Sequence, residues 1–200
     1  MPSAGAVLDA IWGAGALGLS ASFFDVDAYR DAGETKQLRL LTLLMLFMAG
    51  VSRALGSAAI LSLNQMPVRR YPLVFAAEGI VFILTAAAFA ISAVLVDLLV
   101  FSGEIPDTRL FWIVALAHSP ILFGLLVMMP YLGEAIDRGL RLWTAVLVFF
   151  ALHRGLEMPL HAAIGVALIG WLTFALLRVA FGRPVGHLVG AARRLAAGRL

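Results

Sequence analysis

The chain has 200 residues, of which 62% are hydrophobic and only 14% are charged, and its formal net charge is +3. Soluble domains are roughly half apolar and about a quarter charged. The composition therefore argues against a soluble enzyme and indicates an integral membrane protein. The chain contains no cysteine, which excludes disulfides, thiolate catalysis, iron–sulfur clusters and cysteine-type zinc sites.

The first apolar stretch covers residues 4–24, but Asp9 and many glycine and alanine residues dilute it. No basic region precedes it, so a signal peptide is not expected. We expect this stretch to be a helix in the membrane interface, anchored by Trp12 and Phe23, and the alternative is a transmembrane span. The polar residues 25–39 then form a short amphipathic helix or loop that leads into the membrane domain.

Five further apolar stretches carry most of the chain. They cover residues 40–63, 71–101, 110–132, 139–156 and 159–181. A helix needs roughly 20 apolar residues to cross a bilayer core about 30 Å thick, and four of the five stretches have that length. The fourth is the weakest, because its charge-free part covers only residues 142–152. We predict an all-α membrane bundle of five spans over residues 40–182, or of six if residues 4–24 also cross.

Residues 183–200 form a basic tail that we expect to lie on an anionic membrane surface. Its candidate headgroup-contacting residues are Arg183, Arg193, Arg194 and Arg199. Lysine and arginine are more frequent on the side that carries this tail, so the positive-inside rule places the C-terminus in the cytoplasm. The N-terminus is then outside for five spans and inside for six. Arginine far outnumbers lysine, which is typical of GC-rich bacterial genomes and points to a bacterial inner membrane.

Two opposite charges, Arg53 and Glu78, fall inside the first two predicted spans. These spans are consecutive and antiparallel, so both residues lie toward the same side of the bilayer. A lone charge at this depth costs at least ~2.5 kcal/mol, so each charge is expected to have a partner. We predict a structural ion pair between them. The alternative is an ion or proton path, or a polar substrate site.

Three residues, His118, Ser119 and Pro120, interrupt the third predicted span. Pro120 should kink the helix, because its ring removes one backbone hydrogen bond. We expect His118 to bond a neighbouring helix or a carbonyl freed near the proline. The alternatives are a proton path or ligation of a haem or chlorin. The four histidines are too scattered for metal-ligand spacing, so no metal site and no cofactor are predicted.

The order of elements resembles that of the Yip-domain family of small membrane proteins, in particular its bacterial branch. Residues 117–133 (AHSPILFGLLVMMPYLG) resemble the family's third helix, with a small residue and a proline at its start and an apolar run that ends in proline and glycine. Residues 142–143 (LW) and 147–154 (LVFFALHR) resemble the next helix, which typically contains a tryptophan and ends near an arginine. Residues 161–171 (HAAIGVALIGW) resemble the final helix.

This resemblance, which covers roughly residues 20–180, implies a five-helix bundle without known catalytic residues. Eukaryotic members of the family act in vesicle trafficking through partner proteins that include small GTPases, and most bacterial members have no assigned function. The family's eukaryotic orientation has a cytosolic N-terminus, which the charge distribution gives for six spans and not for five.

No nucleophile–base set, phosphate loop or HExxH helix is visible in the sequence, so enzymatic activity is not expected. No basic stripe with interleaved aromatic residues suggests a nucleic-acid partner. Small loops and small-residue helix faces favour a non-enzymatic scaffold or accessory subunit that packs against other integral membrane proteins in a larger complex. The alternative is a small transporter or channel that uses Arg53, Glu78 and His118.

Overall fold

The computed structural model describes residues 4–56, 71–100, 107–129, 131–173 and 176. Every element within these ranges is helical. Three helices are long and apolar enough to cross a membrane: Lys36–Gly56, Tyr71–Val100 and Thr108–Met128. The helix Leu160–Thr173 is apolar but shorter. These helices indicate a membrane protein, and the five predicted spans are not confirmed.

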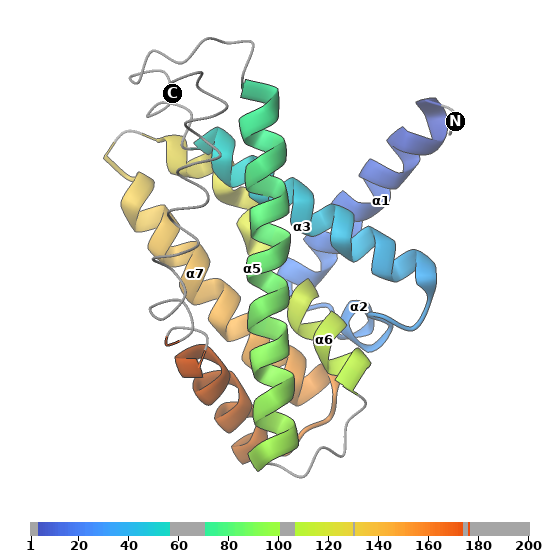
Figure 1. The fold of residues 1–200 in the computed structure, drawn as a ribbon, viewed down its shortest axis with the longest axis vertical. Coiled ribbons are helices and arrows are strands. Elements are labelled where there is room, and N and C mark those ends of the chain that lie inside the picture. The colour runs from blue at the N-terminus through green and yellow to red at the C-terminus, as the bar shows by residue number, and fades with distance from the viewer. Residues whose placement is uncertain (1–3, 57–70, 101–106, 130, 174–175, 177–200) are drawn as a thin grey trace, which may run out of the picture.

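The chain begins with α1 (Ala4–Ser22), the short α2 (Val26–Arg30) and α3 (Lys36–Gly56). α1 packs against α3, and its N-terminal end projects from the rest of the molecule (Figure 1). The small size of Gly18 permits this contact, because a Cβ there would lie 2.9 Å from the side chain of Met45. α3 begins at Lys36, earlier than the predicted residue 40.

The longest helix is α5 (Tyr71–Val100), whose 30 residues agree with the predicted second span. Pro72 lies in its first turn, where the missing N–H has no intrahelical partner to lose. α5 would be roughly 45 Å long, which exceeds the thickness of a bilayer core. It approaches α3 through two glycines: a Cβ on Gly50 would lie only 2.7 Å from the Cα of Gly79. Such close backbone approach is typical of helix pairs in membranes.

The third apolar segment consists of α6 (Asp107–Leu116) and the 3₁₀ helix η2 (Ser119–Met128). The α-helix stops before His118, and Pro120 lies in the first turn of η2. The sequence predicts a kink here, and the structure has a change of helix type. A proline removes one α-helical hydrogen bond, which favours the tighter winding of the 3₁₀ helix. α6 packs against α5, and η2 packs against α3.

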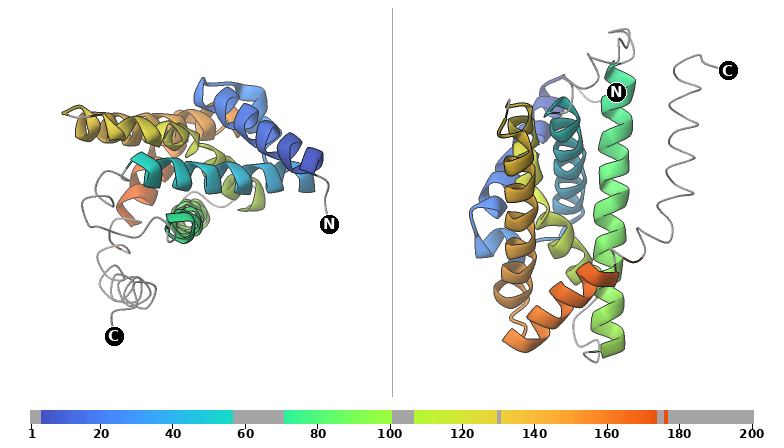
Figure 2. Two further views of the ribbon diagram at one scale, coloured as in Figure 1. Left: turned by 90° about the horizontal axis from the view of Figure 1, so that it is seen from above. Right: turned by 90° about the vertical axis from the view of Figure 1, so that its left-hand side faces the viewer.

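The helix α7 (Gly133–Phe150) continues into a π-helical turn, η3 (Ala151–Gly155). It corresponds to the predicted fourth span, but it is not among the three helices apolar enough to cross a membrane. The reason is its first half, which carries four charged side chains: Glu134, Asp137, Arg138 and Arg141. In the right-hand view of Figure 2, the helix Leu160–Thr173 runs from the lower end of α7 toward α5, and the left-hand view shows α3 between α7 and α5.

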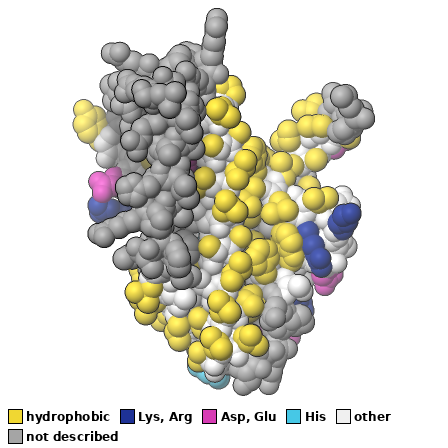
Figure 3. Space-filling model, viewed as in Figure 1, with side chains coloured by type: hydrophobic (Ala, Val, Ile, Leu, Met, Phe, Trp, Pro, Cys, Tyr) yellow, Lys and Arg dark blue, Asp and Glu magenta, His cyan; other side chains and the backbone are white. Residues whose placement is uncertain are grey.

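The buried core consists mainly of alanine and medium-sized apolar side chains from α3, α5 and α6, such as Met45, Ala90 and Leu116. The outer surface is also largely apolar. Figure 3 shows hydrophobic side chains spread along α5 and over the projecting α1, with charged side chains near the edges of this face. Helices that pack in lipid are expected to bury small residues at their interfaces and to expose apolar side chains on the outer surface.

The basic tail and the end of the fifth predicted span fall outside the described residues. This applies to the four predicted headgroup-contacting residues, Arg183, Arg193, Arg194 and Arg199. Their role stays a prediction.

Candidate functional site

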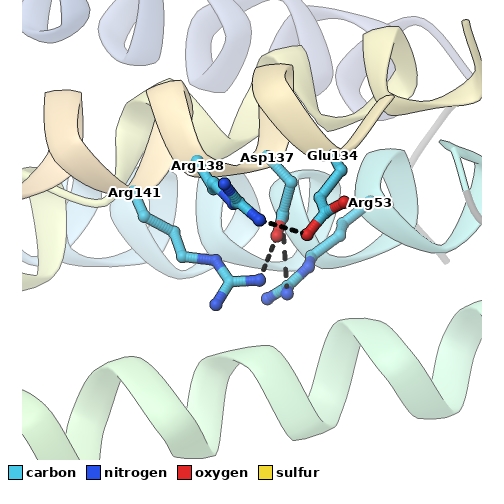
Figure 4. A network of polar contacts seen from close by, with 5 residues as sticks. All are labelled: Arg53, Glu134, Asp137, Arg138 and Arg141. Atoms are coloured by element: carbon cyan, nitrogen blue, oxygen red, sulfur yellow. Dashed lines mark hydrogen bonds and ion pairs between the residues drawn. The ribbon is translucent and has the colours of Figure 1, made fainter. Parts of the chain in front are cut away.

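A cluster of charged side chains joins the end of α3 to the start of α7. Nη2 of Arg53 lies 3.5 Å from Oδ1 of Asp137, and Oδ2 of Asp137 pairs with Arg141. Arg138 pairs with Glu134 beside them. Figure 4 shows these five residues, which we call the Arg53 cluster. The carboxylate of Asp137 thus contacts the guanidinium groups of both Arg53 and Arg141.

The sequence of α7 explains half of this cluster. Glu134 and Arg138, like Asp137 and Arg141, are four residues apart, so each pair lies on one face of the helix with the acid on the N-terminal side. The Asp137 side chain is only 17% exposed, whereas that of Arg141 is 59% exposed. Asp137 therefore lies beneath the arginines that it pairs with.

Close packing at Gly124 positions Arg53. A Cβ on Gly124 would lie 2.8 Å from the Cα of Arg53, so the glycine lets η2 lie directly against the end of α3. Ser52 supports the same contact, because its hydroxyl donates to the carbonyl oxygen of Leu122 at 2.6 Å and accepts from the amide of Leu125 at 3.0 Å. These contacts pack the last turn of α3 against η2, which in turn packs against α7.

The sequence predicts Glu78 as the partner of Arg53, and the structure gives Arg53 a contact with Asp137. Glu78 is half-buried on α5, and its carbonyl oxygen lies 2.8 Å from the position of a Cβ on Gly50, one turn before Arg53. A contact between Arg53 and Glu78 stays a prediction. Arg53 lies in the last turn of α3, with its side chain 45% exposed, and residues 57–63 of the first predicted span lie outside the described residues.

His118 lies at the break between α6 and η2. Its Nδ1 is 2.9 Å from the carbonyl oxygen of Val114. Because a carbonyl only accepts, Nδ1 carries the proton and Nε2 holds the lone pair of the neutral ring. The ring packs edge-on against Phe82 and Phe89, at centroid distances of 6.3 and 5.4 Å. The transport alternative, which places His118 and Arg53 on one path, stays a prediction.

A buried polar group beside the same break was not predicted from the sequence. The hydroxyl of Ser22 lies 2.8 Å from the carbonyl oxygen of Gly18 and 3.0 Å from the hydroxyl of Ser119. Tyr29 donates its phenol proton to the carbonyl oxygen of Ala21 at 2.8 Å. Ser22, Ser119 and Tyr29 are all fully buried. Because Ser22 and Ser119 are 97 residues apart in the chain, no local pattern points to their contact.

Burial raises the pKa of Tyr29 well above its ordinary value. A hydrogen bond with Ser119 offsets part of this effect, and the negative charge of Asp25 adds to it. The phenol therefore stays protonated and remains a hydrogen-bond donor. Together, Tyr29 and Ser22 tie α1 and α2 to the break in the third apolar segment.

A second set of charges lies near the start of α6. Arg30 pairs with Glu157 at 2.9 Å, and Arg109 donates to the carbonyl oxygen of Arg30 at 3.2 Å. These contacts bring together α2, the first turn of α6 and the segment after η3.

An apolar pocket of about 440 Å³ lies between α5, α7 and the helix Leu160–Thr173. It is lined by Phe89, Ala145, Val148, Phe149, Ile164, Ala167, Leu168 and Trp171. Two histidines contact aromatic residues that line the pocket. His118 packs against Phe89, and His153 stacks on Phe149 with a centroid distance of 6.0 Å. Within the part of the chain that the structure describes, no three histidine, aspartate or glutamate side chains gather as a metal site.

The chain matches no protein-family model, no curated protein and no solved structure. The resemblance to the Yip-domain family therefore stays a prediction, neither supported nor contradicted.

Proposed function

We propose that this protein is a non-enzymatic scaffold or accessory subunit that packs against other integral membrane proteins in a larger complex. The observation that carries the proposal is an apolar stripe on the outer side of α1. It consists of Leu8, Trp12, Gly15 and Leu19, and we call it the α1 outer stripe. Leu8, Trp12 and Leu19 are 66%, 82% and 46% exposed.

The spacing of the α1 outer stripe suits contact with another helix. Its residues follow one another at intervals of four, three and four, which is the spacing of the seam between two packed helices. Its glycine is open, since a Cβ on Gly15 would meet nothing within 4 Å. In lipid, helices associate where a small residue lets two backbones approach. The opposite face of α1 is already occupied, because Ala14 and Gly18 pack inside the molecule.

We further infer five membrane spans, with α1 in the interface and the C-terminus in the cytoplasm of a bacterial cell. Three apolar helices of spanning length support membrane residence. The clustering of Arg30 and Arg109 supports the grouping of charges on which this orientation depends.

Gentle extraction of the full chain from its native membrane, followed by size and mass analysis, tests the proposal. We expect the chain to migrate with at least one other membrane protein in a fixed ratio. Gly15→Leu should abolish this association, because the added side chain fills the space that a partner helix would occupy. Gly139→Leu is the matched control, since Gly139 on α7 also has nothing within 4 Å of its Cβ position.

Three results would count against the proposal. A bare monomer from native membranes would remove the evidence for any complex. A homo-oligomer that is lost in Gly15→Leu would keep the α1 outer stripe as an interface but contradict a hetero-complex. Equal loss of the partner in Gly15→Leu and Gly139→Leu would show that the stripe itself is not the contact.

A further inference from the structure

The 3₁₀ helix η2 is unusually long. It covers ten residues, Ser119–Met128, whereas runs of more than about three or four are uncommon, because 3₁₀ hydrogen bonds have poorer geometry than those of an α-helix. At both of its ends the hydrogen bonds join residues three apart: Ile121 donates to the carbonyl oxygen of His118 at 3.2 Å, and Met129 donates to that of Leu126 at 3.1 Å. A long 3₁₀ stretch of this kind often marks a hinge.

The sequence of η2 does not require this winding. Pro120 lacks an N–H and accounts for the break after α6, but a proline in the first turn is equally compatible with an α-helix. The eight residues that follow it are ILFGLLVM, in which leucine and methionine are good α-helix formers and Gly124 is the only poor one. Local preference therefore favours an α-helix, and the 3₁₀ form depends on contacts with other parts of the molecule.

Ser52 on α3 makes a contact that selects the 3₁₀ form. Its hydroxyl donates to the carbonyl oxygen of Leu122 at 2.6 Å and accepts from the amide of Leu125 at 3.0 Å. These two groups are three residues apart, so a 3₁₀ turn brings them together as a pair, and the hydroxyl bridges that pair. In an α-helix the same carbonyl and the same amide would each bond to a residue four positions away. Both hydrogen bonds, which we call the Ser52 bridge, are therefore lost if η2 becomes an α-helix.

The two windings of η2 differ in length. Ten residues rise roughly 20 Å along the axis of a 3₁₀ helix and roughly 15 Å along that of an α-helix. At one end of η2, α6 packs against α5, and beyond the other end α7 begins at Gly133. Rewinding of η2 would therefore draw the start of α7 roughly 5 Å toward α6. It would also move Asp137 on α7 relative to Arg53 on α3, which are in contact.

We propose that η2 is a length switch between α6 and α7, held in its longer 3₁₀ form by the Ser52 bridge. Without the bridge, residues 119–128 rewind into an α-helix and α7 moves toward α6. The bridge consists of two hydrogen bonds of ordinary strength, so its loss shifts the balance between the two forms roughly 30-fold toward the α-helix. The switch does not involve the α1 outer stripe and does not depend on the scaffold function.

Distance measurements by pulsed electron paramagnetic resonance on the full chain test this switch. The chain has no cysteine, so Thr108→Cys in the first turn of α6 and Ala135→Cys in the first turn of α7 introduce two thiols for spin labels at exposed positions. We expect one main distance in the labelled protein, and a main distance about 5 Å shorter when Ser52→Ala is added. Ser52→Thr keeps a hydroxyl and should keep the longer distance.

Two controls separate a change in η2 from a general loosening of the protein. Ser92→Ala also removes a buried hydroxyl, but one that donates to the carbonyl oxygen of Ala88 in its own helix, so it should keep the longer distance. Spin labels at positions 84 and 108 lie on α5 and α6 and do not span η2. Their distance should be the same in every variant.

A second variant leaves Ser52 in place. Gly124→Ala favours the α-helix through its propensity, and its methyl group would lie 2.8 Å from the Cα of Arg53, against the packed 3₁₀ form. We expect it to give the shorter distance as well. Size-exclusion chromatography checks that each variant is folded.

Three results would overturn the proposal. The first is an unchanged distance in both Ser52→Ala and Gly124→Ala. The second is a distribution that only broadens around the original distance, because it would show that Ser52 supports packing without selecting a form of η2. The third is an equal shortening in Ser92→Ala, which would show that the change does not depend on the Ser52 bridge.

Discussion

At the residue scale, the most consequential side chain is one that the sequence places in a connector. Asp137 was expected between two spans, yet its largely covered carboxylate pairs with both Arg53 and Arg141. A carboxylate between two guanidinium groups balances charges that would otherwise repel each other. The contribution of Asp137 to the stability of the protein should therefore exceed that of an exposed ion pair.

This difference predicts the outcome of two matched substitutions on α7. Asp137→Asn should lower the stability of the protein more than Glu134→Gln, because it removes a largely buried carboxylate that contacts both Arg53 and Arg141. Glu134→Gln removes a pair in which both side chains are well exposed, and such pairs contribute only about 0–1 kcal/mol. Thermal unfolding in detergent measures both. Equal shifts in melting temperature would show that Asp137 has no special role.

Tyr29 gives a prediction about alkaline pH. In the unfolded chain its phenol ionises near the ordinary pKa of about 10. In the folded protein burial raises the pKa, so the phenol keeps its proton to higher pH. The stability that depends on the protonated phenol is therefore fully present below pH about 10 and is lost as the pH rises further, by up to about 1.4 kcal/mol per pH unit.

The variant Tyr29→Phe isolates this effect. At neutral pH it should be less stable than the unchanged protein by about 1 kcal/mol, because it loses the hydrogen bond to Ala21. Above pH about 10 the difference between the two proteins should shrink, since only the unchanged protein carries the phenol. Denaturant unfolding at pH 8, 10 and 11 measures it. A difference that stays constant over this range would contradict the burial of Tyr29.

At the element scale, the contact between α3 and α5 depends on two glycines that leave no room for side chains. Gly50→Ala would place a methyl group 2.7 Å from the Cα of Gly79, and a backbone atom cannot move aside as a flexible side chain does. We expect a loss of about 1–3 kcal/mol in the free energy of unfolding. The measurement is thermal or denaturant unfolding in detergent.

Gly139→Ala is the control for this substitution. It lies inside α7 with open space around its Cβ position, so it should stabilise the protein by about 0.5–1 kcal/mol through helix propensity alone. If Gly50→Ala were as stable as Gly139→Ala, the close approach of α3 and α5 would be wrong.

At the element scale, the bounds of some helices could be predicted from the sequence and those of others could not. The long apolar stretch of residues 71–101, which contains Glu78 and Asp97 and begins beside a proline, predicts α5 (Tyr71–Val100). For α7 the apolar run predicts a later start, because charged residues fill the first half of the helix. Those charges follow the four-residue spacing of a helix, so the ion pairs within α7 could have been predicted from the sequence. The pairing of Asp137 with Arg53 was not, since it depends on how α3, η2 and α7 pack.

At the scale of the whole molecule, a buried polar contact links two segments that are 97 residues apart in the chain. Ser22 and Ser119 meet inside the bundle, beside the break after α6. No periodicity in the sequence predicts such a contact, because it depends on where α1 crosses the other helices. It fixes one face of α1 to the bundle and leaves the α1 outer stripe exposed. The proposed scaffold function depends on this arrangement.

Cross-linking in native membranes tests this proposal most directly. The chain has no cysteine, so Leu8→Cys and Leu19→Cys each introduce a single thiol that can carry a photoreactive cross-linker. Leu84→Cys is the control, because Leu84 is 63% exposed on α5, away from the stripe. We predict that positions 8 and 19 cross-link to the same membrane protein and that position 84 does not. Products shared by all three positions, or adducts with lipid alone, would contradict a partner on the α1 outer stripe.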